Sequence, residues 1–282
     1  MKLLRYGPMG QEKPGLLDNQ GNIRDISSII TDIDGSTLDK ATLDKLSAIT
    51  SGSLPIVEGS PRIGPCVNGV NKVICIGLNY HDHAAEVGAK PTPEPRIFMK
   101  ANSSICGPND NVEIPRGSQK TDWEVELTIV IGKKAKYIDE TSAMDHIAGY
   151  CLANDVSERD YQMHRSGQWV KGKSHDTFCP IGPWLVTKDE IEDPHDLNIW
   201  LEVDGVRRQN GTTSNLVHRI PVIISHLSQF MTLVPGDIVL TGTPAGVGMG
   251  IKSEPIFLKP GMTMELGIDG LGTQKQRTIS AV

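Results

Sequence analysis

The chain has 282 residues and a formal net charge of −6 at pH 7, a length that allows one large hydrophobic core with a smaller appendage. The negative charge and the scattered lysines and arginines argue against non-specific nucleic-acid binding. No apolar run reaches the length of a membrane span, and the first seven residues lack the apolar stretch of a secretory signal, so we expect a cytoplasmic protein that binds neither nucleic acid nor membrane.

Residues 1–70 predict a small N-terminal α+β domain. Its expected elements are strands at 3–6, 15–17 and 22–26, a helix at 38–49, and a Gly-, Ser- and Pro-rich connector at 51–65. Ser36 or Thr37 is expected to cap the helix, because both can accept a hydrogen bond from its first amides. Nothing in this region predicts chemistry, and we expect it to be structural or to form an interface.

Residues 71–282 predict a larger, β-rich α+β domain that carries the chemistry. The expected strands lie at 73–78, 125–131, 147–153, 197–203, 238–241 and 262–268. One helix is predicted where apolar residues recur at helical spacing from Ile220 to Met231, with Pro221 near its start. The strands do not alternate with helices often enough for a doubly wound sheet.

A cluster with possible catalytic use follows the strand expected at 73–78. If residues 80–86 form a helical turn, His83 and Glu86 share a face at i, i+3. A carboxylate beside an imidazole raises the basicity of the ring and fixes its orientation, as a general base requires. An ordinary ion pair on a surface turn would have the same spacing, and the pattern leaves both interpretations open.

Three acidic residues predict a metal site. Glu124 and Glu126 open the strand expected at 125–131, and residues i and i+2 of a strand point to one face. Two carboxylates this close repel each other, and a hard divalent cation removes the repulsion. Asp155, after the next expected strand, would complete an open site of oxygen ligands. Because E-x-E is a common pattern, a solvated strand edge is the open alternative.

Asp155 also begins a polar segment that could bind a substrate. In a helix that starts after Asp155, the side chains of Asp155, Arg159 and Gln162 fall on one side. A guanidinium and an amide beside a metal suit an anionic, oxygen-rich substrate. The alternative is a capped helix in which Arg159 pairs with Asp155 at i, i+4.

Residues 167–174 match the phosphate-loop pattern G-x-x-x-x-G-K-S. Phosphate binding by this motif requires a buried strand before it and a helix that starts at the lysine. The residues before the match are polar, and the prolines at 180 and 183 exclude a helix interior after it. We therefore predict that this segment does not bind a nucleotide.

The chain resembles the fumarylacetoacetate hydrolase family over nearly its whole length, and most specifically over residues 73–250. The motifs that carry the resemblance are I-G-L-N-Y at 76–80 with His83 and Glu86, I-F-M-K at 97–100, D-W-E-V-E at 122–126, N-D-V-S-E-R-D at 154–160 with Gln162, G-K-S at 172–174, and L-T-G-T-P-A-G-V-G at 240–248. Each motif is weak alone, but their order and spacing are specific.

The resemblance implies a mixed β-sandwich roll with a small N-terminal domain, assembled as a homodimer or a dimer of dimers, that binds Mg²⁺ or else Mn²⁺ or Ca²⁺. The implied metal ligands are Glu124, Glu126 and Asp155; the implied catalytic residues are His83, Glu86 and Lys173; and the implied substrate-binding residues are Arg159, Gln162, Thr243 and Lys100. A fourth aspartate ligand of the long eukaryotic members has no counterpart here, which favours the shorter, acylpyruvase-like branch.

The resemblance also implies an enzyme that hydrolyses a carbon–carbon bond of a 2,4-diketo acid to give pyruvate and a carboxylic acid. The preferred substrate is a 2,4-diketo-3-deoxy sugar acid, such as L-2,4-diketo-3-deoxyrhamnonate or -fuconate. His83 with Glu86 would deprotonate water, and Lys173 would offset the developing negative charge. Three other reactions are open: oxaloacetate decarboxylation, isomerisation of 2-hydroxyhepta-2,4-diene-1,7-dioate, and ureidoglycolate cleavage. A metal-stabilised binding protein without turnover is the non-enzyme alternative.

Overall fold

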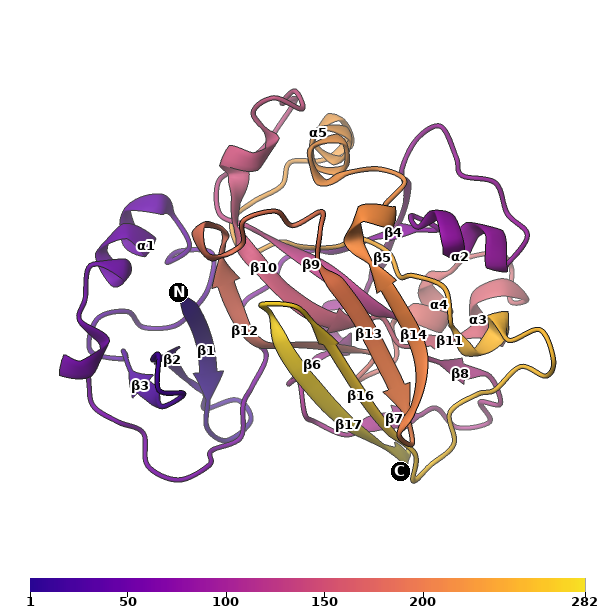
Figure 1. Ribbon diagram of the computed structural model, residues 1–282, viewed down its shortest axis with the longest axis horizontal. Helices are drawn as coiled ribbons and strands as arrows, with labels where there is room; N and C mark the ends of the chain where they lie inside the picture. The colour runs from indigo at the N-terminus through magenta and orange to yellow at the C-terminus, as the bar shows by residue number, and fades with distance from the viewer. Residues whose placement is uncertain (282) are drawn as a thin grey trace.

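Among residues 1–281, which the computed structural model describes, the strands form two large sheets and one short pair (Figure 1). The ten-stranded sheet consists of β1 (Lys2–Tyr6), β2 (Lys13–Leu17), β3 (Ile23–Asp25), β4 (Val73–Gly77), β5 (Arg96–Lys100), β6 (Ile105–Cys106), β9 (Val125–Ile131), β10 (Ile147–Asn154), β12 (Cys179–Thr187) and β15 (Ile238–Leu240). The five-stranded sheet consists of β7 (Val112–Ile114), β13 (Asn198–Val203), β14 (Val206–Thr212), β16 (Thr263–Ile268) and β17 (Gly272–Ser280). The short pair is β8 (Thr121–Asp122) with β11 (Ser157–Glu158).

Both large sheets mix parallel and antiparallel pairs. The larger one has the order β3-β2-β1-β12-β10-β9-β15-β4-β5, with β6 on β12, and the smaller one has the order β14-β13-β16-β17-β7. The pairs β4–β15, β6–β12 and β7–β17 are parallel. This is the β-rich α+β fold that the sequence predicts. The strand expected at 125–131 has the predicted bounds, and the other expected strands of residues 71–282 differ by one residue at one end.

A hydrophobic core fills the space between the two large sheets. Leu127 and Ile129 of β9 pack in it with Leu201 of β13 and Leu266 of β16. Val130, the residue after Ile129, belongs to a second core on the other face of the large sheet. Because β9 is buried on both faces, most of its residues are apolar, and this apolar run predicts its bounds from the sequence.

The N-terminal segment extends the large sheet and covers its second face. Strand β1 pairs with β12, and β2 and β3 continue the sheet outward to its edge. Leu3 and Ile26 pack in the second core with Val130 and Ile238. Figure 1 shows this segment on the left, with helix α1 (Lys40–Ser47) above the strands. The division into two domains at residue 70 stays a prediction.

Helix α1 is shorter than predicted at both ends, and its predicted caps are wrong. Asp39 caps it, because its Oδ1 accepts hydrogen bonds from the amides of Ala41 (2.9 Å) and Thr42 (3.1 Å). Ser36 and Thr37 instead bond within the preceding turn. An ionised carboxylate satisfies two free amides at once and interacts favourably with the positive end of the helix, so it is the better cap.

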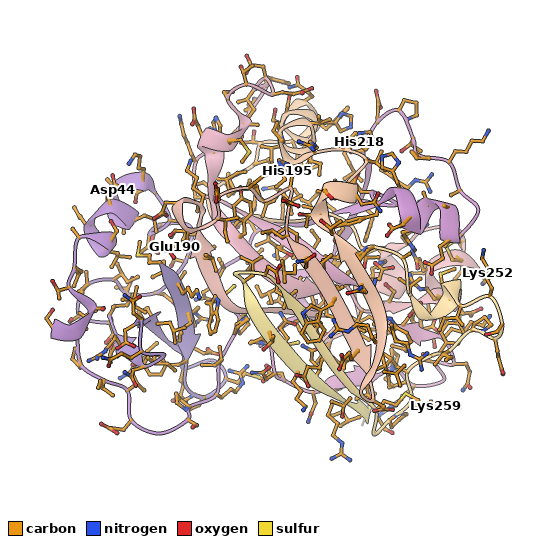
Figure 2. The ribbon with its side chains drawn as sticks, in the orientation of Figure 1. Asp44, Glu190, His195, His218, Lys252 and Lys259 are labelled. Atoms are coloured by element: carbon orange, nitrogen blue, oxygen red, sulfur yellow. The ribbon has the colours of Figure 1, made fainter. Side chains whose placement is uncertain are left out.

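The remaining helices of residues 1–281 are α2 (His81–Glu86), α3 (Arg159–Met163), α4 (Val170–Lys173) and α5 (Ile220–Phe230). None of the helices in this range is long and apolar enough to cross a bilayer. Helix α5 buries the apolar face that its sequence predicts. Its first residue, Ile220, donates its amide to Nε2 of His195 at 3.2 Å, so a distant loop supplies the bond that a capping side chain would make (Figure 2).

Gly149 allows strand β10 to lie close to β12. A Cβ atom at this position would lie 2.1 Å from the carbonyl oxygen of Val186, which is backbone and cannot move aside. We therefore expect Gly149→Ala to lower the free energy of unfolding by about 1–3 kcal/mol in urea denaturation. Gly52→Ala is the matched control, because a Cβ there would meet no atom within 4 Å; its effect should stay within about 0.5 kcal/mol. Equal effects in the two variants would contradict this explanation.

Candidate active site

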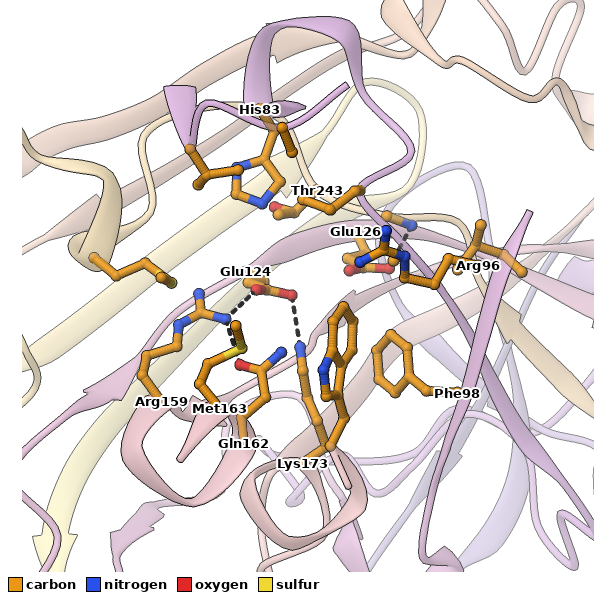
Figure 3. Close-up of a pocket in the computed structure, with 18 residues that line it drawn as sticks. His83, Arg96, Phe98, Glu124, Glu126, Arg159, Gln162, Met163, Lys173 and Thr243 are labelled. Atoms are coloured by element: carbon orange, nitrogen blue, oxygen red, sulfur yellow. Dashed lines mark hydrogen bonds and ion pairs between the residues drawn. The ribbon is translucent and has the colours of Figure 1, made fainter. Parts of the chain in front are cut away.

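A cavity of about 310 Å³ lies beside the ends of β4, β5 and β9 and is bordered by α2, α3 and α4. The predicted site residues that line it are His83, Glu124, Glu126, Arg159, Gln162, Lys173 and Thr243. Figure 3 shows His83 on one side of the cavity and Arg159, Gln162 and Lys173 on the other, with the two glutamates between them. The cavity is of a size suited to a small ligand.

Strand pairing brings the three predicted metal ligands together. Carboxylate oxygens of Glu124, Glu126 and Asp155 lie within 4.8 Å of one another, and all three residues are buried. Glu126 lies in β9, and Asp155 follows β10, whose last residue, Asn154, pairs with Val125. Glu124 precedes β9 instead of lying within it, but the amide of Asp155 donates to its carbonyl oxygen at 2.8 Å and extends the pairing.

The three carboxylates fit a hard divalent cation. Glu126 accepts a hydrogen bond from the amide of Gly242 at 2.7 Å, but it has no ion pair among residues 1–281. Burial and the charges of Asp155 and Glu124 hold the pKa of Glu126 well above its ordinary value. A cation bound among these oxygens would relieve that repulsion, and an all-oxygen donor set is the one that Mg²⁺, Mn²⁺ and Ca²⁺ prefer.

Lys173 and Arg159 neutralise the carboxylates that border Glu126. The Nζ atom of Lys173 lies 2.9 Å from Oε2 of Glu124 and 2.6 Å from Oδ2 of Asp155. Burial opposes the charge of Lys173, but the attraction of Asp155 and Glu124 outweighs it and holds the lysine pKa above its ordinary value. Lys173 is therefore a cation that faces the cavity at neutral pH.

Arg159 and Gln162 share a face of α3, where Nη1 of Arg159 donates to Oε1 of Gln162 at 3.1 Å. The i, i+4 pair between Arg159 and Asp155, which the sequence leaves open, is absent, because α3 begins only at Arg159. Arg159 donates instead to Oε1 of Glu124 at 2.6 Å and to Oδ2 of Asp122 at 2.9 Å. The guanidinium is thereby held at the wall of the cavity.

Lys100 lies behind the carboxylates. The resemblance places it among the substrate-binding residues, whereas its Nζ donates to Oδ1 of Asp155 at 2.5 Å and to the carbonyl oxygen of Val156 at 3.1 Å. Lys100 is 2% exposed and does not line the cavity. These contacts hold the carboxylate oxygen of Asp155 that Lys173 does not contact.

Buried His83 and half-buried Glu86 form a pair on α2, at the predicted spacing. Nδ1 of His83 lies 3.0 Å from Oε2 of Glu86, and Oε1 of Glu86 accepts from the amide of Gly246 at 2.9 Å. Because a carboxylate can only accept, Nδ1 carries the proton of this bond and Nε2 is left to take up another. His83 is 6% exposed and lines the cavity, so the pair is not an ordinary surface ion pair.

Thr243 lines the cavity, but its hydroxyl group is already bonded. It donates to the carbonyl oxygen of Val125 at 2.8 Å and accepts from Nε2 of Gln209 at 2.7 Å. Gln209 also accepts from the amide of Val125 at 3.0 Å, and so ties β14 to the start of β9. Gln209 lies in a hairpin strand without a motif, so no sequence pattern indicates this role.

Asp122 is a second residue that the sequence analysis did not assign. Its Oδ1 accepts from the amide of Gly248 at 2.7 Å, and its Oδ2 accepts from Arg159. The carboxylate therefore joins the loop at 240–248 to α3. Asp122 is the first residue of the D-W-E-V-E motif, so this motif is the sequence feature that could have indicated its role.

Gly172 explains the false phosphate-loop match. Helix α4 ends at Lys173 instead of starting there, and a Cβ at Gly172 would lie 2.3 Å from the carbonyl oxygen of Glu158. The glycine thus lets α4 approach the start of α3, and this close packing directs Lys173 toward the carboxylates. The G-K pair therefore serves to place a lysine.

Residues 72–279 match the family model described as fumarylacetoacetate (FAA) hydrolase C-terminal. A relative from Burkholderia orbicola, whose name proposes a hydrolase and gives no substrate, is 59% identical over 281 residues, which cover 100% of this chain and 100% of the relative.

Three solved structures are similar over nearly the whole chain. The fumarylacetoacetate hydrolase of Exiguobacterium antarcticum is 33% identical, with a TM-score of 0.87 and 100% of each chain covered. The maleylpyruvate hydrolase of Sphingobium sp. SYK-6, in complex with manganese(II) ion and pyruvate, is 29% identical, with a TM-score of 0.82 and 100% of each chain covered. A 2-hydroxyhepta-2,4-diene-1,7-dioate isomerase from Mycobacterium marinum is 34% identical, with a TM-score of 0.74, and covers 99% of this chain and 98% of its own.

Proposed function

Because the chain belongs to the fumarylacetoacetate hydrolase family, we propose that it is a metal-dependent hydrolase that cleaves a carbon–carbon bond of a 2,4-diketo acid to give pyruvate and a carboxylic acid. The observation that carries the proposal is the position of His83 across one cavity from Lys173 and the buried carboxylates (Figure 3). The manganese(II) ion and pyruvate in the Sphingobium hydrolase structure support both the metal and the product.

In this proposal Glu124, Glu126 and Asp155 hold a divalent cation, with Mg²⁺ as the first candidate. When bound, the cation supplies Lewis-acid chemistry that orients the 2-oxo acid end of the substrate and stabilises enolate charge. Arg159 and Gln162 provide a guanidinium and an amide for the carboxylate at that end.

Residues on opposite sides of the cavity have different roles in the proposed reaction. His83 takes a proton from water through Nε2, while Glu86 holds the ring and stabilises its positive charge. The water oxygen bonds to C4 of the substrate, and Lys173 offsets the negative charge that develops. The C3–C4 bond then breaks, its electron pair passes to C3, and the proton held by His83 is returned there. Water thus supplies the hydroxyl group of the acid and the new hydrogen of pyruvate.

The acyl group beyond C4 is the least defined part of the substrate. The wall of the cavity includes the apolar side chains Val87, Phe98, Met163, Trp169 and Met249. Such a wall gives the hydroxyl groups of a sugar acid few hydrogen-bond partners. We therefore propose to assay 2,4-diketo-3-deoxy sugar acids beside simpler acylpyruvates, instead of treating them as the only substrates.

Isomerisation of a 2-hydroxy-2,4-dienoate is the second candidate, favoured by the similarity to the Mycobacterium marinum isomerase. This reaction moves a proton between carbon atoms and adds no water. The same base, His83, would serve it, but no pyruvate would be released.

Chelation provides the test of the proposed function. Pyruvate release from acetylpyruvate should fall by about a hundredfold or more in EDTA and return when Mg²⁺ or Mn²⁺ is added in excess. A coupled lactate dehydrogenase assay measures the pyruvate. Unchanged activity in EDTA would contradict the metal requirement. An absence of pyruvate from every diketo acid, together with metal-dependent isomerisation of a dienoate, would favour the second candidate.

A further inference from the structure

We propose that Asp122 is a positioning residue, which holds the guanidinium of Arg159 so that its remaining donor faces the carboxylate at the 2-oxo acid end of the substrate. The inference rests on the proposed function and adds to it a residue that does not line the cavity. It is carried by the way in which the N–H groups of Arg159 are divided among their partners.

Arg159 has one nitrogen atom without a hydrogen bond. Its Nε donates to Oδ2 of Asp122 at 2.9 Å, and its Nη1 donates to Oε1 of Glu124 at 2.6 Å and to Oε1 of Gln162 at 3.1 Å. Nη2 lies 2.9 Å from Oδ2 of Asp122, but it is buried and its N–H groups make no hydrogen bond within residues 1–281. A buried donor without an acceptor is unfavourable. Because Arg159 lines the cavity, a carboxylate bound there would supply the acceptor for Nη2.

Asp122 is the carboxylate that Arg159 does not share with another cation. Glu124 also contacts Nζ of Lys173 at 2.9 Å and is a proposed metal ligand, so its charge is divided. Among residues 1–281, the only cation that pairs with Asp122 is Arg159. Burial opposes the charge of Arg159, but the attraction of Asp122 and Glu124 outweighs it and holds the arginine pKa above its ordinary value. Asp122 therefore anchors the guanidinium independently of the charge on Glu124.

Backbone amides fix Asp122 itself. Its Oδ1 accepts from the amides of Trp123 at 2.8 Å and Gly248 at 2.7 Å, and its Oδ2 accepts from the amide of Met249 at 3.0 Å. Gly248 permits this approach, because a Cβ there would lie 2.7 Å from Oδ1 of Asp122. A fully buried carboxylate that accepts from three amides has one position available to it. That position determines where the guanidinium of Arg159 lies.

The variant Asp122→Asn tests this role. The amide has nearly the shape of the carboxylate, but its NH₂ group would face N–H donors in either orientation, so Arg159 would lose its anchor. Titration calorimetry with pyruvate in excess Mg²⁺ should show about tenfold weaker binding. KM for acetylpyruvate should rise by about the same factor and kcat should change by less than about threefold, because the substrate carboxylate is bound equally before and during the reaction. Asp122→Glu keeps the charge and moves it, so it should weaken pyruvate binding as well, and it replaces the first variant if Asp122→Asn does not fold.

A double-mutant cycle separates this role from a general effect on the fold. If Asp122 acts through Arg159, Asp122→Asn should weaken pyruvate binding in the unaltered protein but by less than about twofold in Arg159→Met. Gln209→Leu is the matched control. Gln209 is also buried and donates to Thr243 at 2.7 Å and Pro244 at 2.8 Å in the same loop, but it does not contact Arg159. Its replacement should change pyruvate affinity by the same factor in both backgrounds.

Two results would overturn the role of Asp122 while leaving the proposed function in place: the same loss of pyruvate affinity from Asp122→Asn in both backgrounds, or a fall in kcat as large as the rise in KM. Failure of the unaltered protein to bind pyruvate in excess Mg²⁺ would overturn the 2-oxo acid site itself, and the inference with it. A loss of affinity that requires Arg159 would support the inference even if acetylpyruvate were not cleaved.

Discussion

Replacement of His83 by alanine is expected to lower kcat for acylpyruvate hydrolysis by about a hundredfold to ten-thousandfold, the usual contribution of a general base. The imidazole lines the cavity and is oriented by Glu86, so its loss removes the proton acceptor. The proposed metal ligands lie just before β9, on β9 and after β10, and not on α2, so the cation should remain bound. Steady-state kinetics with pyruvate detection, and calorimetry with Mg²⁺, measure the two effects separately.

His81→Ala is the matched control for this experiment. His81 belongs to the same helix, is exposed and does not line the cavity. Its replacement should change kcat by no more than about twofold. Near-normal turnover of His83→Ala would show that another group accepts the proton. A binding protein without turnover would show no activity to lose in either variant and normal metal affinity in both.

Lys173→Met is expected to lower kcat by about a hundredfold or more, as the loss of an electrostatic group at a developing oxyanion does. Lys173 is cationic, buried and directed into the cavity, where it contacts two carboxylates. Its removal also leaves these carboxylates less neutralised, and breaking such a buried pair typically costs about 3–5 kcal/mol of stability. Chemical denaturation with and without Mg²⁺ should show a smaller loss when the cation is present.

Lys100→Met separates the two effects of the Lys173 substitution. Lys100 is also buried and bonded to Asp155, but it lies outside the cavity. Both variants should lose stability, and Lys173→Met should lose more in kcat. Equal losses of kcat in the two variants would mean that turnover depends on the charge around Asp155 and not on a direct action of Lys173 on the substrate. A nearly normal kcat for Lys173→Met would exclude the proposed role.

Features that depend on residues close together in the chain were predictable from the sequence. The bounds of β9 follow from its predominantly apolar run, and the contact between His83 and Glu86 follows from helical geometry alone. The cap of α1 shows the limit of such reasoning. Three residues that can cap a helix precede it, and only their backbone positions decide that Asp39 bonds to the first amides.

Contacts between distant segments were not predictable in the same way. The resemblance assigned roles to Lys100 and Arg159, but it could not show that Lys100 approaches Asp155 from behind or that Arg159 bonds to Asp122 and Glu124. Each contact joins residues at least 35 positions apart in the chain. No local pattern encodes which of several buried cations faces which carboxylate, because that depends on the packing of separate strands and helices.

The sequence by itself determined the β-rich fold class, the resemblance to the family, and the identity of the carboxylates, base and lysine of the candidate site. Only the tertiary structure decided that the carboxylates of Glu124, Glu126 and Asp155 meet within 4.8 Å and that Arg96, packed against Trp169, lines the cavity beside them. The physical reason is that apolar periodicity is local, whereas the pairing of β9 with β10 and of β4 with β5 sets which distant side chains converge.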